Sequence, residues 1–381
     1  MYKMNSKNPE VSIILPCRNE EKALPICLKK LKVVLMKEKL NAEIIVSDSS
    51  TDKSPEIAKK FGVKLVKHDL EGYGNAYLEG FKVAKGKYLF LADADGTYDF
   101  GELPRFIRLL KDGNDLVVGN RFGGKMEKGA MSGLHKFIGN PLLSGILRLF
   151  FRTKLRDSHC GMRAIKKESL DKLNLKTTGM EFASEMIVKS LKNNLKIAEL
   201  DINYSKRIGK TKLKSFRDGW RHLRFMLLYS PLFLFFIPGL FLFLFGLLFL
   251  VTLYFTSINL FGVQLYVHPM FIFSMFILIG YQLIFFSAFS KIYAVTHLGD
   301  KSNFLDKIFK HVTLEKSLIF GSITTFVGLI TLITIFVKWI GSDFNDLWEI
   351  KNSIIAMTSI VLGVQTIFSG FMLSIIGIGE R

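Results

Sequence analysis

Two aspartates one residue apart, Asp93 and Asp95, follow an apolar run and precede Gly96 in the stretch YLFLADADGTYDF. Side chains two residues apart on a β-strand point to the same face, so the sequence predicts two neighbouring carboxylates on one face of a strand. Two neighbouring anions repel each other, and a cation between them removes that repulsion. Mg²⁺ and Mn²⁺ prefer oxygen ligands of this kind. A strand that simply ends in a polar turn is the alternative interpretation.

Strand-like and helix-like stretches alternate along the chain up to this motif. Apolar strand-like runs cover residues 11–16, 42–50, 63–69 and 87–95, and stretches with helical spacing lie between them. This alternation predicts an α/β fold with a doubly wound, mostly parallel sheet, in which ligands bind at the carboxyl ends of the strands. Polar residues stand at those ends: Asn19 and Glu20 after the first strand, Asp48 and Ser50 after the second, and Asp93 and Asp95 after the fourth.

The composition changes near residue 225, where long stretches without charge begin. A bilayer-spanning helix takes roughly 20 residues, and four apolar stretches reach that length, at about 231–257, 269–290, 317–337 and 353–377. Buried helices of a large soluble core are the alternative. The start of the chain is polar, and only the loop between the second and third stretches is rich in Lys. We therefore expect a multi-pass cell-membrane protein whose N-terminal domain and two termini are cytoplasmic.

The net charge of +19 indicates an anionic partner. Each Lys or Arg near anionic lipid headgroups contributes about 1 kcal/mol to membrane binding. No zinc-finger, homeodomain or RNA-binding pattern is present, so we expect membrane lipids rather than nucleic acid as the partner. Residues 216–230 mix Arg, Trp and other aromatic residues, which is typical of an amphipathic interfacial helix. The sequence therefore predicts three parts: a cytoplasmic domain at 1–215, an interfacial segment at 216–230 and a transmembrane domain at 231–381.

Several motifs together resemble a known family. VSIILPCRNEE, EIIVSDSSTDKS, GYGNA and LADADGTYD are similar to the nucleotide-sugar half of the family 2 GT-A glycosyltransferases. GNRFGG, DSHCGMRAIKK and RIGKTKLKSFRDGWRHLRFM narrow the resemblance to the polyprenyl-phosphate hexose synthases, the group that contains the dolichyl-phosphate mannose and glucose synthases. The resemblance covers roughly residues 11–225. It implies a GT-A, Rossmann-like catalytic domain.

The resemblance also implies a site for a nucleotide sugar, a UDP- or GDP-hexose. Asp95 would bind Mg²⁺ or Mn²⁺ directly, and Asp93 would reach the same metal or the ribose. Thr97 stands where mannose synthases of the group commonly carry Gln, so its hydroxyl is a candidate third ligand. The other implied nucleotide-sugar contacts are Pro16, Asn19, Glu20, Asp48, Ser50, Gly74, Asn75, Ala94, Arg207 and Lys212.

Basic residues mark the acceptor side. A lipid phosphate is an anion, and Arg offers it planar, bidentate donors. Arg121 and Arg163 lie in family motifs and are candidates for this contact, with Lys136 as a third candidate. A phosphomonoester has a second pKa of about 6, so it is already a nucleophile at neutral pH and needs no catalytic base. We expect Asp93 and Asp95, together with these two arginines, to be the catalytic residues. His135 and His159 are further candidates for a base or a phosphate contact, and Asp157, beside His159, is a candidate charge partner or base.

These expectations combine into one reaction. A membrane-anchored, metal-dependent transferase would move a hexose from a nucleotide sugar to dolichyl or another polyprenyl phosphate, with inversion at the anomeric carbon. DADGTYD is more similar to the glucose-type members than to the mannose-type members, so UDP-glucose is preferred to GDP-mannose as the donor, and N-acetylhexosamine stays open. The alternatives are a processive polysaccharide synthase, whose Q-x-x-R-W motif DGWRHLRF does not supply, and a non-catalytic membrane assembly or flippase component. The sequence leaves the oligomeric state open.

Overall fold

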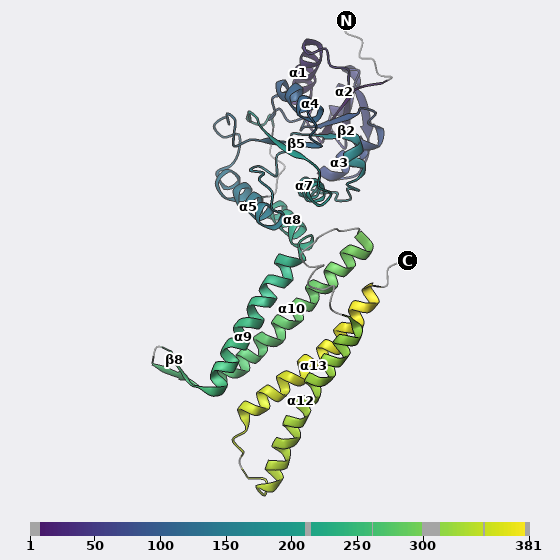
Figure 1. The fold of residues 1–381 in the computed structure, drawn as a ribbon. Coiled ribbons are helices and arrows are strands. Elements are labelled where there is room, and N and C mark those ends of the chain that lie inside the picture. Colours follow the sequence, from purple (N-terminus) through teal and green to yellow (C-terminus); the bar gives the residue numbers. More distant parts are fainter. Residues whose placement is uncertain (1–7, 210–214, 261, 299–312, 346, 378–381) are drawn as a thin grey trace. The chain divides into compact units, whose positions relative to one another are not determined.

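The computed structural model describes residues 8–209, 215–260, 262–298, 313–345 and 347–377 (Figure 1). Contacts divide the chain into two compact units, unit 1 (Met1–Tyr229) and unit 2 (Ser230–Arg381). The helix that covers most of the predicted interfacial segment, α8 (Ser215–Leu228), belongs to unit 1. The assignment of this segment to the membrane interface stays a prediction.

Unit 1 is built on a seven-stranded sheet with the strand order β3-β2-β1-β4-β6-β5-β7. Strand β6 runs antiparallel to its neighbours β4 and β5, and the other adjacent strands pair in parallel. The predicted mostly parallel sheet is therefore confirmed. The strands are β1 (Val11–Cys17), β2 (Ala42–Asp48), β3 (Lys64–Lys67), β4 (Tyr88–Leu91), β5 (Leu116–Asn120), β6 (Arg163–Lys166) and β7 (Ile197–Asp201).

Helices connect these strands, as the sequence predicts. Besides α8, they are α1 (Leu24–Lys37), α2 (Ser54–Lys60), α3 (Tyr73–Val83), α4 (Leu103–Lys111), α5 (Asn140–Phe151), α6 (Lys167–Asp171) and α7 (Phe182–Lys192), with the short helical segments η1 (Phe100–Glu102) and η2 (His135–Gly139).

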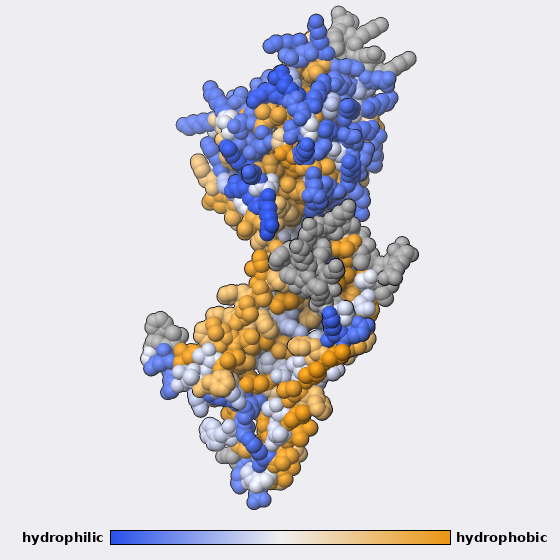
Figure 2. Space-filling view, in the orientation of Figure 1, coloured by the Kyte–Doolittle hydropathy of each residue, from blue (hydrophilic) through white to orange (hydrophobic). Residues whose placement is uncertain are grey.

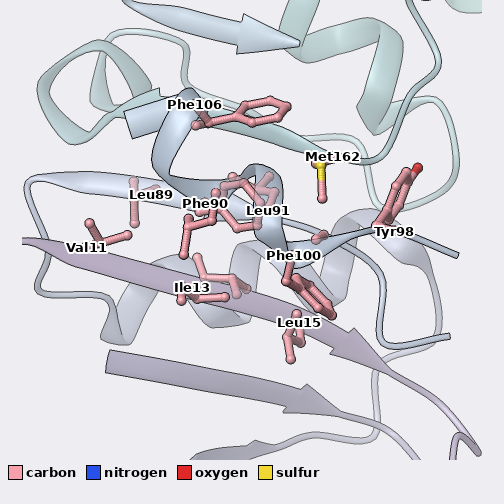
Figure 3. Packing of buried hydrophobic residues seen from close by; sticks show 14 of the residues in the cluster. Val11, Ile13, Leu15, Leu89, Phe90, Leu91, Tyr98, Phe100, Phe106 and Met162 are labelled. Atoms are coloured by element: carbon pink, nitrogen blue, oxygen red, sulfur yellow. The ribbon is translucent and has the colours of Figure 1, made fainter. Parts of the chain in front are cut away.

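Two of these helices pack on opposite faces of the sheet. Gly80 of α3 lies against Ile14 of β1, where a Cβ atom at residue 80 would be 2.5 Å from Cγ2 of Ile14. The preceding residue, Ile13, points to the other face. Its neighbour Phe90 on β4 meets Phe106 of α4 edge to face, with ring centroids 5.5 Å apart, and Figure 3 shows these side chains in the core. Helices on both faces are the doubly wound, GT-A-like arrangement that we expected.

Unit 2 has four long apolar helices among its described residues. The segments long and apolar enough to cross a membrane are Leu232–Phe255, His268–Val295, Leu314–Gly341 and Ile350–Gly377. They coincide with the four predicted stretches to within a few residues at most ends, and this agreement supports the expectation of a multi-pass membrane protein. The elements are η3 (Leu232–Phe236), α9 (Ile237–Phe255), α10 (His268–Leu298), α12 (Leu314–Gly341) and α13 (Ile350–Gly377), with a hairpin of β8 (Ile258–Leu260) and β9 (Val263–Leu265).

The surfaces of the two units differ in character. In Figure 2, hydrophobic side chains cover much of the helices of unit 2, whereas hydrophilic side chains predominate on the visible face of unit 1. Within unit 2, small residues let helices approach closely, as they do in membrane bundles. A Cβ atom at Gly363 of α13 would lie 2.5 Å from the carbonyl oxygen of Gly321 on α12.

Candidate active site

The candidate site lies at the carboxyl ends of β1 and β4. Within the sheet, β2 pairs with one edge of β1 and β4 pairs with the other edge, so the chain leaves β1 toward β2 and later returns to the opposite side of β1. Ligands of open α/β sheets bind in the crevice at such a point, where the strand order changes direction. Glu20 follows β1 and Asp95 follows β4, so the fold brings these two predicted residues to the same edge.

Strand β4 is shorter than the sequence predicted. It ends at Leu91, and Asp93 and Asp95 lie in the turn that follows, where Gly96 has a φ of 82°. The expectation that strand alternation places both carboxylates on one face is therefore wrong. The physical reason is that the turn backbone pairs outside the sheet: Ile208 N donates to Asp95 O at 2.9 Å, and Ser205 N donates to Thr97 O at 2.8 Å.

Asp95 is buried and held from two sides. Its Oδ1 accepts hydrogen bonds from Thr97 N at 3.0 Å and from Thr97 Oγ1 at 2.6 Å. Its Oδ2 accepts from Arg207 Nη1 at 2.6 Å, and Arg207 Nη2 donates to Glu20 Oε1. The Thr97 hydroxyl is thus engaged in orienting Asp95, and its role as a third metal ligand stays a prediction.

Asp93 carries an unsatisfied acceptor. Its Oδ1 is buried and has no hydrogen-bond partner among the described residues. Loss of solvation, and then the charge of Asp95, raise the pKa of Asp93 to about 7, while a hydrogen bond with Tyr73 and the charges of Arg207 and Arg121 lower it. Burial raises the pKa of the Tyr73 hydroxyl, which therefore stays protonated and donates.

These carboxylates fit a divalent cation that is shared with a phosphate ligand. The described residues contain no group of three or more His, Cys, Asp or Glu that could hold a metal by themselves. Mg²⁺ is usually bound by one or two carboxylates, and substrate phosphates and water supply its other ligands. The unpartnered Asp93 Oδ1, together with the carboxylate of Asp95, matches that pattern.

The ends of β1 and β2 are tied together by the predicted nucleotide-binding residues. Asn19 N donates to Ser50 Oγ at 2.8 Å, and Ser50 Oγ donates to Asp48 Oδ1 at 2.6 Å. Asn19 has a φ of 54°, and its amide oxygen accepts from Thr51 N at 2.8 Å. Pro16 is half-buried near the end of β1. The structure therefore brings Asn19, Asp48 and Ser50 together, as their positions at the carboxyl ends of the strands predicted.

Gly74 and Asn75 have a different environment from the one we expected. Gly74 N donates to Gly179 O at 3.2 Å, and Asn75 N donates to Thr178 O at 3.1 Å. A Cβ atom at Gly74 would collide with the carbonyl oxygen of Thr177. The close backbone approach that Gly74 permits is thus made by residues 177–179, which favours a structural role for both residues.

Arg121 pairs with Asp157 in the interior. Arg121 Nε donates to Asp157 Oδ2 at 2.6 Å, and Arg121 Nη2 donates to Asp157 Oδ1 at 2.8 Å. The guanidinium carbon also lies 5.4 Å from the centroid of the Tyr204 ring. Asp157 is 0% exposed, so this bidentate pair is shielded from water. Arg121 nevertheless lies close enough to Asp93 for its charge to lower the pKa of that carboxyl.

Arg163 is a buried cation held by carbonyl oxygens. Arg163 is 2% exposed. Its guanidinium donates to Cys160 O at 2.8 Å, to Ala183 O at 2.7 Å and to Ser158 O at 2.8 Å. Each of its three guanidinium nitrogens is thus engaged with the backbone, which favours a role in positioning the 158–163 segment. Among the other predicted residues, Ala94 is buried in the core and Lys136 lies on η2, while Lys212 lies outside the described residues.

Two histidines form a buried hydrogen-bonded network around the same segment. Ser184 Oγ lies 3.3 Å from His159 Nε2 and 2.8 Å from His222 Nδ1, and Ser158 Oγ lies 2.9 Å from His159 Nδ1. Burial, the neighbouring histidine and the Arg163 charge lower the pKa of His159. Burial and then the Arg163 charge lower the pKa of His222 to about 3. Both rings are therefore neutral at physiological pH, which disfavours His159 as a proton donor to phosphate.

Acidification is expected to destabilise unit 1 through His222. The folded-state pKa of about 3 lies below the usual unfolded value, so the unfolded chain binds more protons and the free energy of unfolding falls as the pH drops below about 6.5. Between about pH 7.5 and pH 5 the loss from this one group is about 2 kcal/mol. Urea unfolding of the full chain in detergent at both pH values measures it. The loss should be smaller in His222→Gln and unchanged in the control His135→Gln; an equal loss in His222→Gln would contradict the assignment.

Sequence reasoning missed two tyrosines at the site. Tyr98 accepts a hydrogen bond from Gly161 N at 2.8 Å, and a Cβ atom at Gly161 would lie 2.8 Å from Asp93 Oδ2. Tyr73 hydrogen-bonds with Asp93. Both tyrosines stand within the motifs GYGNA and LADADGTYD, and that position was the available signal.

Comparison with known proteins finds family matches in both units. Residues 12–173 match the family Glycosyl transferase family 2, and residues 288–377 match the Glycosyltransferase family 2 C-terminal transmembrane region. The low-salt glycan biosynthesis hexosyltransferase Agl6 of Haloferax volcanii is 36% identical over 370 residues, which cover 97% of this chain and 89% of that protein.

Two further proteins are similar over the N-terminal part. The dolichyl-phosphate hexose transferase of Haloferax volcanii is 30% identical over 213 residues, 55% of this chain and 89% of that protein. The crystal structure of glucosyl-3-phosphoglycerate synthase from Mycobacterium tuberculosis aligns at 18% identity with a TM-score of 0.48, over 58% of this chain and 80% of that chain. From the family matches and the similarity to Agl6 along nearly the whole length, the chain is a glycosyltransferase and belongs to glycosyltransferase family 2.

Proposed function

We propose that this glycosyltransferase moves a hexose from a nucleotide diphosphate sugar to dolichyl or another polyprenyl phosphate, with inversion, in a reaction that depends on Mg²⁺ or Mn²⁺. The observation that carries the proposal is the placement of Asp93 and Asp95 in the turn after β4, with Arg207 joining Asp95 to Glu20 at the end of β1. The name of the relative that transfers hexose to dolichyl phosphate supports the choice of acceptor.

Each group of side chains at the site has its own proposed role in the reaction. Asp93 and Asp95 would hold the divalent cation, which supplies positive charge to the departing diphosphate. Arg207 lies beside them and can donate to a phosphate oxygen, and the charge of Arg121 is near enough to act on the same region. Asp48 and Ser50 lie at the β2 end, where the nucleotide would bind. The acceptor phosphate is its own nucleophile, so the chain has only to position it and stabilise charge.

The acceptor is proposed to reach the site along an apolar surface of unit 1. Exposed apolar residues lie on three of its helical segments: Phe137 on η2, Leu142 and Leu149 on α5, and Phe216 and Trp220 on α8, of which Phe216 is 91% exposed. Helix α8 packs against α5 and α7 through Leu147, Ile187 and Phe225. Such a surface can rest on a bilayer while a lipid presents only its phosphate, with Lys136 close by. We propose that unit 1 and both termini are cytoplasmic, because the excess of Lys in the loop between the second and third apolar stretches favours that side of the membrane.

The reaction can be tested with the full chain in detergent, a short polyprenyl phosphate and Mn²⁺. UDP-glucose, UDP-N-acetylglucosamine and GDP-mannose are offered separately, and lipid-linked sugar is scored. We expect transfer of a single sugar from UDP-glucose and its loss in Asp95→Asn. Products with several sugars would favour the processive synthase instead. Absence of transfer from every donor, with nucleotide still bound, would favour a non-catalytic role.

A further inference from the structure

Arg207 engages the oxygen atoms that the proposed function assigns to a divalent cation. Asp95 Oδ1 already accepts two hydrogen bonds from Thr97, and Asp95 Oδ2 accepts from Arg207 Nη1 at 2.6 Å. The same guanidinium donates to Glu20 Oε1 through Nη2. A carboxylate offers about four lone-pair sites, and three of those on Asp95 are in use. A cation that binds Asp95 must therefore approach the oxygen that Arg207 holds.

The backbone fixes this contact. Hydrogen bonds from Ile208 N to Asp95 O and from Ser205 N to Thr97 O, at 2.9 and 2.8 Å, attach the segment on both sides of Arg207 to the turn. A Cβ atom at Gly96 would lie 2.8 Å from Cδ1 of Ile208, so the absence of a side chain at residue 96 permits this close packing. The Arg207 side chain is only 24% exposed. The backbone hydrogen bonds and the packing therefore fix the Arg207–Asp95 ion pair in place, unlike an ion pair between two exposed side chains.

Two polar atoms of the site have no partner among the described residues. They are the acceptor Asp93 Oδ1 and the donor Arg207 Nε, and both are buried. An unpaired buried acceptor beside Asp95 suits a cation, and an unpaired buried donor on a guanidinium suits a phosphate oxygen. A divalent cation and a diphosphate together would satisfy both atoms, whereas either one alone would leave the other atom unpaired.

The charges of the site also favour binding of the cation together with a diphosphate over binding of the cation alone. Glu20 and Asp95 share the single positive charge of Arg207. A free divalent cation that bound Asp95 would be repelled by the guanidinium at the same carboxylate. A diphosphate bound next to Arg207 and Asp95 offsets this repulsion, because its negative charge attracts both the cation and the guanidinium N–H groups of Arg207.

We propose that Arg207 is an exchangeable counter-ion of the active site, an inference that rests on the proposed function. Without nucleotide, Arg207 holds Asp95 and Glu20 and disfavours a free divalent cation. When the nucleotide diphosphate binds, the guanidinium transfers its hydrogen bonds from Asp95 to the phosphate oxygens, and Asp95 becomes available to the cation. The nucleotide and the cation therefore bind together, and each strengthens the binding of the other. By this exchange Arg207 selects for the cation–nucleotide complex over the cation alone.

The test is Mn²⁺ binding to the full chain in detergent, followed by the electron paramagnetic resonance signal of free Mn²⁺, with and without UDP. In the wild type, UDP is expected to tighten Mn²⁺ binding by at least about tenfold. Arg207→Gln is expected to bind Mn²⁺ alone about tenfold more tightly than the wild type and to lose most of the effect of UDP. Arg207→Lys keeps the charge and should resemble the wild type for Mn²⁺ alone. Arg105→Gln, which breaks an exposed ion pair with Glu102, is the matched control and should change neither value.

A second variant covers the case in which Arg207→Gln does not fold. Glu20→Gln leaves the guanidinium to Asp95 and removes a negative charge beside the cation site, so it should weaken binding of Mn²⁺ alone, whereas UDP should still tighten that binding. Equal Mn²⁺ affinity of the wild type and both folded variants, with Mn²⁺ bound in the presence of UDP, would overturn the inference and leave the proposed function standing. Absence of Mn²⁺ binding in every sample, with and without UDP, would instead overturn the metal dependence and the inference with it.

Discussion

Asp93→Asn is expected to lower the rate of hexose transfer by about 10²- to 10³-fold and to raise the free energy of unfolding at the same time. Asp93 Oδ1 has no hydrogen-bond partner among the described residues and is therefore available to a cation. The rate falls because the neutral amide of Asn offers that cation no anionic oxygen. Stability rises because the carboxylate is desolvated and lies beside Asp95, and both effects oppose its ionisation. Single-turnover transfer and urea unfolding measure the two effects separately.

Asp99→Asn is the matched control for this prediction. Asp99 lies in the same motif, is exposed and accepts a hydrogen bond from Gly101 N at 2.9 Å, which an asparagine can also accept. It should leave both the rate and the stability near the wild-type values. A slow Asp93→Asn enzyme that is also less stable than the wild type would contradict the argument, because the slow rate would then follow from damage to the fold.

Asp157→Asn is expected to lower the free energy of unfolding by about 3–5 kcal/mol, because it leaves the charge of Arg121 buried without its partner. Asp157 accepts from Arg121 through both carboxylate oxygens, and it is 0% exposed. Urea unfolding of the full chain in detergent, followed by circular dichroism, measures the change. Glu79→Gln is the control: it breaks the surface pair of Glu79 with Lys82, and it should cost less than about 1 kcal/mol.

The double variant Arg121→Met/Asp157→Asn separates stability from chemistry. Removing both charges takes away the buried, unpaired guanidinium, so stability should recover toward the wild type. Transfer should stay slow in the double variant if the charge of Arg121 acts on the reacting phosphates as proposed. Recovery of both stability and transfer would limit Arg121 to a structural role, and a double variant as unstable as Asp157→Asn would show that the lost charge pair is not the cause.

The sequence alone predicted the class of fold and the four membrane helices, because the signals for them are local. Alternating apolar runs and helical spacing predicted the elements up to β4, and the uncharged stretches predicted four membrane helices that match Leu232–Phe255 and its three successors. The motif LADADGTYD placed Asp93 and Asp95 at a strand end, which is correct. Its extension of β4 through Asp95 is wrong because spacing along the chain does not reveal which segment supplies the next backbone hydrogen bonds.

The tertiary structure decided which of the predicted residues face one another. Asp95 and Arg207 are 112 residues apart, and only the folded chain shows that Ser205 and Ile208 supply backbone hydrogen bonds to the turn that follows β4. The guanidinium of Arg163 is a suitable donor for a phosphate, yet in the folded chain it donates to three backbone carbonyl oxygens inside unit 1. Gly74, the second glycine of GYGNA, packs against the carbonyl of Thr177. A side chain's chemistry is local and can be read from one residue type, whereas its partners depend on contacts between distant segments, and those contacts exist only after the chain has folded.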